Sequence, residues 1–377
     1  MKLHDLPTPS LVLDRGKLAA NAAVMRARMD GHGIQLRPHA KTAKSAAVAR
    51  VAAGDDANAL TVSTLAEAAY FLDHGFTDLI YAVCVTPAKL DAVRSLMDRG
   101  ADLKIITDNV GVARAIAAHG GAHRVLIEID CGEHRTGVVP DAPALMDIGS
   151  AVAAGGNASI AGVMTHAGHS YASRSAAEAA DIAEAERLAA VTAAARLRDA
   201  GHATPIISVG STPTATHGRN FDGVTEARPG VYVFQDLFQA GIGSCGMTDL
   251  ALSVLASVIS HNPSRGAMML DAGGLALSKD RSTAALDGGG DYGFGLVCDL
   301  DGTPVPGLIV AGVHQEHGDV PIADAALFDR FPVGARVRVL PNHACMTAAA
   351  YGHYQVVDQA VDGGMGVVAV WDRCGGW

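Results

Sequence analysis

Apolar runs alternate with amphipathic stretches over the first 240 residues, and this alternation predicts strands separated by helices. From residue 18 to about 240 an apolar strand, a turn and an Ala-rich helical pattern recur. Several helical patterns end in Gly, a common signal for the C-terminal end of a helix. The eight predicted strands are IQLRPHAKT, ALTVST, LIYAVCV, LKIITD, VLIEID, IAGVMTHAG, PIISVGS and VTEARPGVYVF.

Eight strands that alternate with helices favour an α/β fold, a closed eight-stranded (β/α)8 TIM barrel. A doubly wound open sheet is the structural alternative, because a strand count alone does not separate the two. After about residue 243 the pattern changes to short strand-like segments punctuated by Gly, Pro and Asp. We therefore predict a barrel over residues 10–243 and a β-rich C-terminal domain over residues 244–377. Residues 1–9 are predicted to belong to the second domain as well.

Composition and charge exclude several classes of protein. The chain has 377 residues, of which 49% are hydrophobic, and a net charge of −10, which argues against a nucleic-acid or membrane-surface binder. No apolar run reaches the roughly 18 to 20 residues that span a bilayer, and MKLHDLPTPS has no signal-peptide core. Six cysteines without paired spacing predict free thiols in a reducing cytoplasm.

The stretch RPHAKT carries three cationizable side chains, Arg37, His39 and Lys41, in the first predicted strand. Alternate residues of a strand share a face, so we expect all three to point into the barrel. Burying them requires an anionic partner, which a phosphate-bearing aldehyde cofactor supplies. A lysine crowded by other cations is also a better amine nucleophile for a Schiff base. The alternative is an exposed strand end with solvated charges.

A phosphate site is predicted at SVGSTPT, which follows the seventh strand. Gly210, Ser211 and Thr212 offer backbone N–H groups and hydroxyls, and loops after late barrel strands frequently bind phosphate. The alternative is a Ser/Thr turn that only caps a helix.

Two more motifs fall at strand ends, where the active sites of barrels lie. Arg135 in IDCGEHRTGV can reach an anionic oxygen, or it is a surface arginine. His166 in THAGHSY can stack on a cofactor ring that Tyr171 approaches, or both side chains pack in the core.

A metal pair is predicted in PNHACMT. His343 and Cys345 are two residues apart, so on a strand they face the same side. An imidazole and a thiolate suit zinc, and two protein ligands leave coordination positions open, as a catalytic metal requires. The alternative is a core cysteine beside a histidine that bonds to the backbone.

Taken together, the motifs carry a family resemblance that runs nearly end to end. TPSLVLD, LRPHAKTAKS, IEIDCGEHRTGV, THAGHSY, SVGSTPT, GVTEARPGVYVF and LPNHAC occur in order. The chain resembles the alanine-racemase-like, fold-type III pyridoxal-phosphate enzymes, in the branch of D-serine dehydratase, D-threo-3-hydroxyaspartate dehydratase and D-threonine aldolase. It is most similar to the hydroxyaspartate dehydratase group.

This resemblance implies roles for individual residues. Lys41 would hold pyridoxal 5'-phosphate as a Schiff base and take the Cα proton, with His39 and Arg37 under or beside the cofactor. Arg135 would face the phenolic oxygen, His166 would stack on the ring, and either Tyr171 or Arg228 would contact the ring nitrogen. The phosphate would lie on Gly210, Ser211 and Thr212, helped by Gly230, Val231 and Tyr232. A divalent metal, either zinc or alternatively manganese or magnesium, would lie on His343 and Cys345.

The resemblance also implies an activity, a metal-dependent lyase that dehydrates β-hydroxy D-amino acids to the 2-oxo acid and ammonia. The alternative is an aldolase that yields glycine and an aldehyde. Cys345 stands where such aldolases carry an aspartate, which favours dehydration, whereas His169 is a candidate base for the aldolase. Two further alternatives are less favoured. A non-catalytic cofactor carrier lacks the second domain that this chain is predicted to have, and a racemase needs a second base on the opposite face of the cofactor. The resemblance further implies a homodimer.

Overall fold

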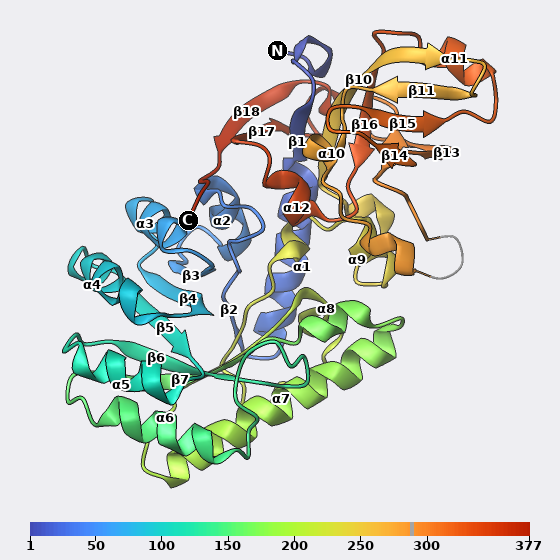
Figure 1. Ribbon diagram of the computed structural model, residues 1–377. Coiled ribbons are helices and arrows are strands. Elements are labelled where there is room, and N and C mark those ends of the chain that lie inside the picture. The colour runs from blue at the N-terminus through green and yellow to red at the C-terminus, as the bar shows by residue number, and fades with distance from the viewer. Residues whose placement is uncertain (287–289) are drawn as a thin grey trace. The chain divides into compact units, whose positions relative to one another are not determined.

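Two compact units make up the chain in this computed structural model, which describes residues 1–286 and 290–377 (Figure 1). The sheet unit holds Met1–Ala22 and Val231–Arg373, and the barrel unit holds Ala23–Gly230 and Cys374–Trp377. This division differs from the predicted boundaries at residues 10 and 244. Residues 10–22 belong with the sheet unit because β1 (Ser10–Asp14) pairs with two strands of its sheet.

Eight parallel strands form the sheet of the barrel unit. Their order is β2-β9-β8-β7-β6-β5-β4-β3, and the two ends of this order meet where His39, after β2, bridges Thr61 of β3. The predicted eight-stranded barrel fold is therefore confirmed, and the doubly wound alternative is wrong. The strands are β2 (Gln35–Leu36), β3 (Ala59–Val62), β4 (Asp78–Cys84), β5 (Asp102–Thr107), β6 (Arg124–Ile129), β7 (Ser159–Thr165), β8 (Ile206–Val209) and β9 (Glu226–Ala227).

Helices alternate with these strands, and several begin at side chains that suit a helix start. Thr64 accepts a hydrogen bond from the N–H of Glu67, and Asn109 and Ser175 cap their helices in the same way. The helices are α1 (Arg15–Gly31), which crosses the division, α2 (Ala46–Ala53), α3 (Leu65–Asp73), α4 (Leu90–Asp98), α5 (Val110–Ala118), α6 (Pro143–Ala153), α7 (Ala176–Asp199) and α8 (Thr212–His217).

The barrel interior divides into an apolar layer and a charged layer. Ile80, Ile106, Leu126 and Met164, from β4 to β7, form one buried apolar cluster. Such a layer is the packed core that alternate barrel strands build.

Arg37 belongs to the charged layer, at the N-terminal ends of the strands. Its side chain is 2% exposed and donates to Glu226 at 2.8 Å and to both carboxylate oxygens of Asp78 at 2.9 Å. Lys104 also pairs with Asp78. Asp78 and Glu226 each begin a strand, so Arg37 lies at the barrel floor. The prediction that Arg37 shares a face with Lys41 is wrong, because β2 ends at Leu36 and the alternation of faces ends with it.

The sheet unit is β-rich, as predicted. Its main strand order is β13-β12-β16-β10-β1-β17-β18, while β11 pairs with β10 and β15, and β14 pairs with β15. The strands are β10 (Leu252–Asn262), β11 (Ala267–Leu270), β12 (Leu296–Cys298), β13 (Pro304–Ile309), β14 (Gly312–Val313), β15 (Gly318–Pro321), β16 (Arg336–Leu340), β17 (His353–Val357) and β18 (Val367–Asp372). The helices are α9 (Leu237–Gly241), α10 (Gly274–Leu277), α11 (Ala326–Arg330) and α12 (Ala344–Ala348).

Short 3-10 helices complete the described elements. They are η1 (Leu3–Asp5), η2 (Pro87–Lys89), η3 (Gly168–Ala172), η4 (Val231–Val233), η5 (Met247–Asp249), η6 (Ser282–Ala285) and η7 (Asp362–Gly364). Within the described ranges, no helix has the length and apolar character needed to cross a bilayer. The six cysteines, all among the described residues, form no disulfide.

The strand predicted over LPNHAC is wrong in its second half. β16 ends at Leu340, and Pro341, which has no backbone N–H to continue the ladder, follows it. His343 is the N-cap residue of α12, and Cys345 lies in the first turn of that helix. A strand-to-helix junction, rather than strand alternation, therefore places these two side chains.

We expect Glu226→Gln to lower the free energy of unfolding by about 3 kcal/mol, because the buried Arg37 loses one of its two carboxylate partners. Urea denaturation followed by circular dichroism measures the loss. Asp73→Asn is the matched control, since it removes the partner of Arg99 in an exposed ion pair, and it should cost less than about 1 kcal/mol. Equal losses in the two variants would contradict the role given to the charged layer.

Candidate active site

Nine residues line a pocket at the C-terminal ends of the barrel strands. They come from β4, β6 and β7 and from the segments that follow β2, β6, β7, β8 and β9. Six of them are predicted site residues. The lining residues are His39, Lys41, Ala82, Glu128, Arg135, Met164, His166, Gly210 and Arg228.

Lys41 lies in a tight turn and not on a strand. The turn begins where the N–H of Ala40 donates to the carbonyl of Thr61 at 2.8 Å. It ends at Lys44, whose N–H donates to the carbonyl of Ala40 at 2.7 Å and whose φ is +48°. The ammonium of Lys44 pairs with Glu67 at 3.0 Å. Lys44 thus anchors the turn, and Lys41 presents its side chain to the pocket.

The two histidines of the pocket are neutral at physiological pH. Burial, together with the ammonium of Lys41, lowers the pKa of His166 to about 3. The same two causes lower the pKa of His39 well below its ordinary value. His166 Nδ1 lies 3.1 Å from the carbonyl oxygen of Gly210, so Nδ1 carries the proton and Nε2 keeps its lone pair. A neutral imidazole with a defined tautomer can pack on a flat ring without adding charge.

Gly210 permits the close approach of two neighbouring strands. Its φ is +133°, and a Cβ there would lie 2.7 Å from the backbone nitrogen of Arg228. Ser211 and Thr212 follow at the start of α8, and neither lines the pocket. The Ser211 hydroxyl accepts from the N–H of Thr214 at 3.2 Å, so the helix-cap reading of this hydroxyl holds. The N–H of Gly210 donates to Glu186 at 2.9 Å and that of Ser211 donates to the Thr214 hydroxyl at 3.1 Å.

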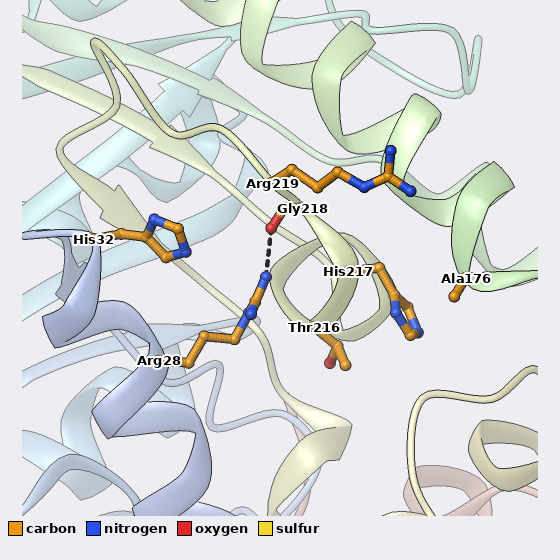
Figure 2. Close-up of a pocket in the computed structure, with 7 residues that line it drawn as sticks. All are labelled: Arg28, His32, Ala176, Thr216, His217, Gly218 and Arg219. Atoms are coloured by element: carbon orange, nitrogen blue, oxygen red, sulfur yellow. Dashed lines mark hydrogen bonds between the residues drawn. The ribbon is translucent and has the colours of Figure 1, made fainter.

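The other end of α8 is held by Arg28 of α1. Its guanidinium donates to the carbonyl oxygens of Ala215, at 2.7 Å, and of Gly218, the second of which Figure 2 shows. Arg28 neutralises the negative end of a short helix here. It lies in a second hollow, lined also by His32, Ala176, Thr216, His217, Gly218 and Arg219.

The loop after β6 carries Arg135. Asp130 shapes this loop, since its carboxylate accepts from the N–H of Gly132 at 2.9 Å and from that of His134 at 3.1 Å. The Arg135 side chain is 55% exposed and lies 3.4 Å from Glu133. Arg135 therefore lines the pocket with a side chain that is more than half exposed.

Arg228 lines the pocket and Tyr171 does not. The buried guanidinium of Arg228 donates to the hydroxyl of Ser208 and to the carbonyl of Thr165, and burial lowers its pKa. Tyr171 lies half-buried in η3. The sequence left both side chains as contacts for one ring nitrogen, and the geometry favours Arg228.

His169, the predicted second catalytic residue, lies on η3 and outside the pocket lining. Its Nδ1 is buried and has no hydrogen-bond partner among the described residues. The imidazole faces the loop that carries Arg135, because a Cβ on Gly132 would lie 3.5 Å from His169 Nε2. His169 is thus a half-buried imidazole whose buried Nδ1 has no partner among the described residues.

The predicted contributions of Gly230, Val231 and Tyr232 lie outside this lining. Gly230 packs on the turn of Lys41, since a Cβ there would lie 3.1 Å from the carbonyl of His39. Val231 and Tyr232 are buried in η4 and belong to the sheet unit.

Glu128 is an acidic residue of the pocket wall that no sequence motif indicated. Glu128 accepts a hydrogen bond from the Cys84 thiol at 3.0 Å, and Asp108 lies close to both. Burial and these two carboxylates raise the pKa of Cys84, so the thiol keeps its proton. Cys84 ends β4, Asp108 directly follows β5, and Glu128 is the last residue but one of β6. An acid inside the apolar run LIEI was the available signal.

In the sheet unit, His343 is surrounded by acidic groups. Its Nδ1 lies 2.8 Å from Asp280 Oδ2, and Cys345 is a second hydrogen-bond partner. Burial acts to lower the pKa of His343, but Asp280 and Cys345 raise it to about 11. The buried Asp236 accepts from the N–H of Ala344 at 2.9 Å, which fixes the backbone between the two predicted metal ligands.

The residues present fit both predicted groups. The barrel pocket combines one primary amine with cationic Arg135 and Arg228 and two neutral imidazoles, a set that suits an aromatic aldehyde with a phosphate. His343 and Cys345 offer nitrogen and sulfur in an anionic setting, which suits a divalent cation. Of the described residues, no set of three close donor groups includes His343. Two protein ligands would thus leave positions open.

Comparison with known proteins identifies the family. The alanine racemase N-terminal domain model matches residues 13–237, and a serine dehydratase domain model matches residues 251–357. D-threo-3-hydroxyaspartate dehydratase of Delftia sp. (strain HT23) is 46% identical over 384 residues, which cover 100% of this chain and 99% of that protein. The chain belongs to the D-threo-3-hydroxyaspartate dehydratase family.

More distant members of the family carry other names. D-serine dehydratase of Dictyostelium discoideum is 28% identical and covers 94% of each chain. D-threonine aldolase of Arthrobacter sp. is 29% identical, with 95% of this chain and 91% of the aldolase covered. The dehydratase family and the aldolases are thus similar over almost their whole lengths.

Solved structures agree with this relation. The Delftia dehydratase superimposes with a TM-score of 0.94 at 45% identity, over 100% of both chains. A structure of a cysteine-to-alanine variant of the dehydratase, described as metal-free, gives a TM-score of 0.95 at 45% identity over 100% of both chains. Alanine racemase of Clostridium difficile, at 13% identity, gives 0.68 over 97% of this chain and 98% of the racemase, which shows a shared fold.

Proposed function

We propose that the protein is a lyase that uses pyridoxal 5'-phosphate and a divalent metal to act on β-hydroxy D-amino acids. It dehydrates D-threo-3-hydroxyaspartate or D-serine to the 2-oxo acid and ammonia. The observation that carries this proposal is the convergence of Lys41, His166, Arg135 and Arg228 on one barrel pocket, in a chain that is 46% identical to a D-threo-3-hydroxyaspartate dehydratase from end to end.

Each pocket residue has a proposed task toward the cofactor, which supplies an electron sink for the bonds at Cα when it is bound. Lys41 attaches the cofactor through its amine. His166 packs on the ring as a neutral imidazole, and Arg135 meets the phenolic oxygen. Arg228 contacts the ring nitrogen, and Gly210, Ser211 and Thr212 bind the phosphate. Further contacts around the cofactor are assigned to His39 and Tyr171, and the phosphate site is completed by Gly230, Val231 and Tyr232.

Lys41 is also the proposed general base. With the cofactor and a substrate bound, the ε-amine of Lys41 would be the group that takes the Cα proton. The turn that ends at Lys44 holds this amine at the pocket. Neither imidazole of the pocket adds a positive charge, because the lowered pKa values of His39 and His166 keep both rings neutral.

His343 and Cys345 are the proposed metal ligands. A bound divalent ion would act as a Lewis acid toward the β-hydroxyl and so assist its departure. Zinc is the proposed ion, because an imidazole and a thiolate are the ligands it prefers, and manganese or magnesium are the alternatives.

Aldol cleavage is a second candidate function. It needs a base for the β-hydroxyl, and the unused Nδ1 of His169 is the observation in its favour. Against it, Cys345 occupies the position where the resemblance assigns an aspartate to aldolases.

We also propose a homodimer in the cytoplasm that acts on a small-molecule D-amino acid and binds neither nucleic acid nor membranes. The family resemblance is the basis for the dimer, and light scattering of the purified protein measures it. A fully active monomer would refute it.

Product analysis is the experiment that tests the proposed reaction. Incubation with D-threo-3-hydroxyaspartate and with D-serine should release ammonia with oxaloacetate or pyruvate, detected by coupled dehydrogenase assays. D-threonine completes the panel. Glycine together with an aldehyde as the main products would replace the dehydratase proposal with the aldolase. The absence of turnover on all three substrates would overturn both.

We expect borohydride reduction followed by peptide mapping to label Lys41. Lys41→Arg should abolish the absorbance of the bound cofactor, because a guanidinium stays protonated and cannot attach it. Lys89→Arg is the matched control, since Lys89 is an exposed lysine outside the pocket lining, and it should leave the absorbance intact. Labelling of Lys44 or Lys104 would show that the assignment of Lys41 is incorrect.

Removal of the metal should stop dehydration while the cofactor absorbance and the fold remain. A chelator followed by dialysis tests this, and added zinc should restore the activity. Cys345→Ala should lower kcat by at least about 100-fold, through the loss of Lewis-acid assistance worth several kcal/mol. Exchange of the Cα proton in D2O, followed by NMR, should continue. Cys374→Ala is the control, and a fully active chelated enzyme would refute the metal site.

A further inference from the structure

Asp280 holds the imidazole of His343 on one side. Its Oδ2 accepts from His343 Nδ1 at 2.8 Å, and both side chains are partly buried, with exposed fractions of 25% and 38%. Cys345 is the other hydrogen-bond partner of the imidazole. The ring therefore has a carboxylate at one nitrogen and a thiol group as its second neighbour.

The carboxylate of Asp280 is itself oriented by the loop that carries it. Its Oδ1 accepts from the N–H of Ser282 at 2.8 Å, and its own N–H donates to the hydroxyl of Ser278 at 2.9 Å. An exposed ion pair of two mobile side chains lacks such supports. Asp280 thus presents Oδ2 in one direction, toward His343.

Asn342 joins this loop to the segment that carries His343. Its Nδ2 donates to the carbonyl of Asp280 at 3.0 Å, and its Oδ1 accepts from the hydroxyl of Thr283 at 2.9 Å. The Asn342 side chain is 2% exposed. Residues 280–283 and 342–343 are therefore joined by hydrogen bonds through Asn342. These bonds hold the two segments together, so the contact between Asp280 and His343 does not depend on the two side chains alone.

A carboxylate at Nδ1 has a defined consequence for the histidine. Nδ1 must carry the proton, so the lone pair of the neutral ring lies on Nε2. Carboxylates placed in this way orient histidine ligands of metals and raise their basicity. The contact of Asp280 is with Nδ1 of the ring, so Nε2 is the nitrogen that it leaves for an ion.

We propose that Asp280 is the positioning residue of the metal site, which sets the tautomer and the direction of His343 so that Nε2 faces the ion. The inference rests on the proposed function, in which His343 and Cys345 hold a divalent metal. It adds a residue that neither the sequence motif nor the ligand pair contains.

Zinc affinity of the purified protein tests the proposal without any reference to activity. Competition with a chromophoric zinc chelator gives the affinity of the wild type, of Asp280→Asn and of Asp280→Glu. We expect Asp280→Asn to bind zinc about 10- to 100-fold more weakly, the usual effect of removing such a carboxylate. Asp280→Glu restores a carboxylate and should recover part of the loss.

Asp91→Asn is the matched control. It removes the carboxylate partner of a different histidine, His119, from an ion pair of 3.1 Å in the barrel unit. Its zinc affinity should equal that of the wild type. The absorption of the cobalt-substituted protein is a second readout, since Asp280→Asn should keep the cysteine-to-cobalt band and change the ligand-field bands.

The outcomes separate the two levels of the proposal. A wild type that binds no zinc overturns the proposed metal site itself. A wild type that binds zinc, together with Asp280→Asn of unchanged affinity and unchanged cobalt spectrum, overturns the role of Asp280 alone. If Asp280→Asn fails to fold, Ser278→Ala, which removes the hydroxyl that accepts from the N–H of Asp280 at 2.9 Å, decides: a weaker affinity supports the role, and an unchanged affinity overturns it.

Discussion

Closure of the parallel barrel after β2 is the constraint on which the pocket depends. Thr61 of β3 donates its N–H to the carbonyl of Pro38 at 3.0 Å and accepts from the N–H of Ala40 at 2.8 Å. These two bonds join the ends of the strand order, and they also end the extended chain, so that residues 40 to 44 turn instead of continuing as a strand. Lys41 owes its position to that turn. A parallel barrel has no free edge to absorb an error in register, so the backbone at Lys41 is set by the whole ring of strands.

The cationic side chains at the two ends of the barrel differ in whether carboxylates of the chain surround them. At the floor, Arg37 is enclosed by Glu226 and Asp78, and burial without these carboxylates would be costly. At the mouth, Lys41 and Arg135 line the pocket, and Glu128 is the carboxylate among its lining residues. Arg228 is buried there, and its guanidinium donates hydrogen bonds to two neutral oxygens, those of the Ser208 hydroxyl and the Thr165 carbonyl. The floor is neutralised within the chain, whereas the mouth keeps positive charge that an anionic ligand can neutralise. Four positions of sequence separate a structural arginine from a pocket lysine.

The eight barrel strands could be predicted in order, because each buried strand is an apolar run and each helix has its own period and caps. The gathering of motifs at strand ends was also predictable, since parallel strands all end at one rim. Three features were not. Arg37 seemed to share a face with Lys41 only as long as the strand was taken to continue beyond Leu36, and tertiary pairing ended it. Cys84, Asp108 and Glu128 meet through neighbouring strands, and no local spacing encodes that meeting. Residues 231–243 join the sheet unit through contacts such as that of Leu237 with Pro341, which are distant in sequence.

The predicted metal pair lies in a local geometry that differs from the strand expected from its spacing. Strand alternation would place the His343 and Cys345 side chains on one face of a strand, but it would not by itself fix the direction of either side chain. The observed junction of β16 and α12 provides that control by separate means. Asp236 accepts from the N–H of Ala344, between the two side chains, and Asp280 accepts from the His343 ring. The two carboxylates differ in character: burial raises the pKa of Asp236 to about 6, whereas the hydrogen bond from His343 is the main cause that lowers the pKa of Asp280 to about 2. Asp280 therefore carries a full negative charge at neutral pH beside the imidazole. That charge favours a cation beside it: the protonated ring in this structure, since the pKa of His343 is raised to about 11, and a metal ion that displaced the proton would take the same role.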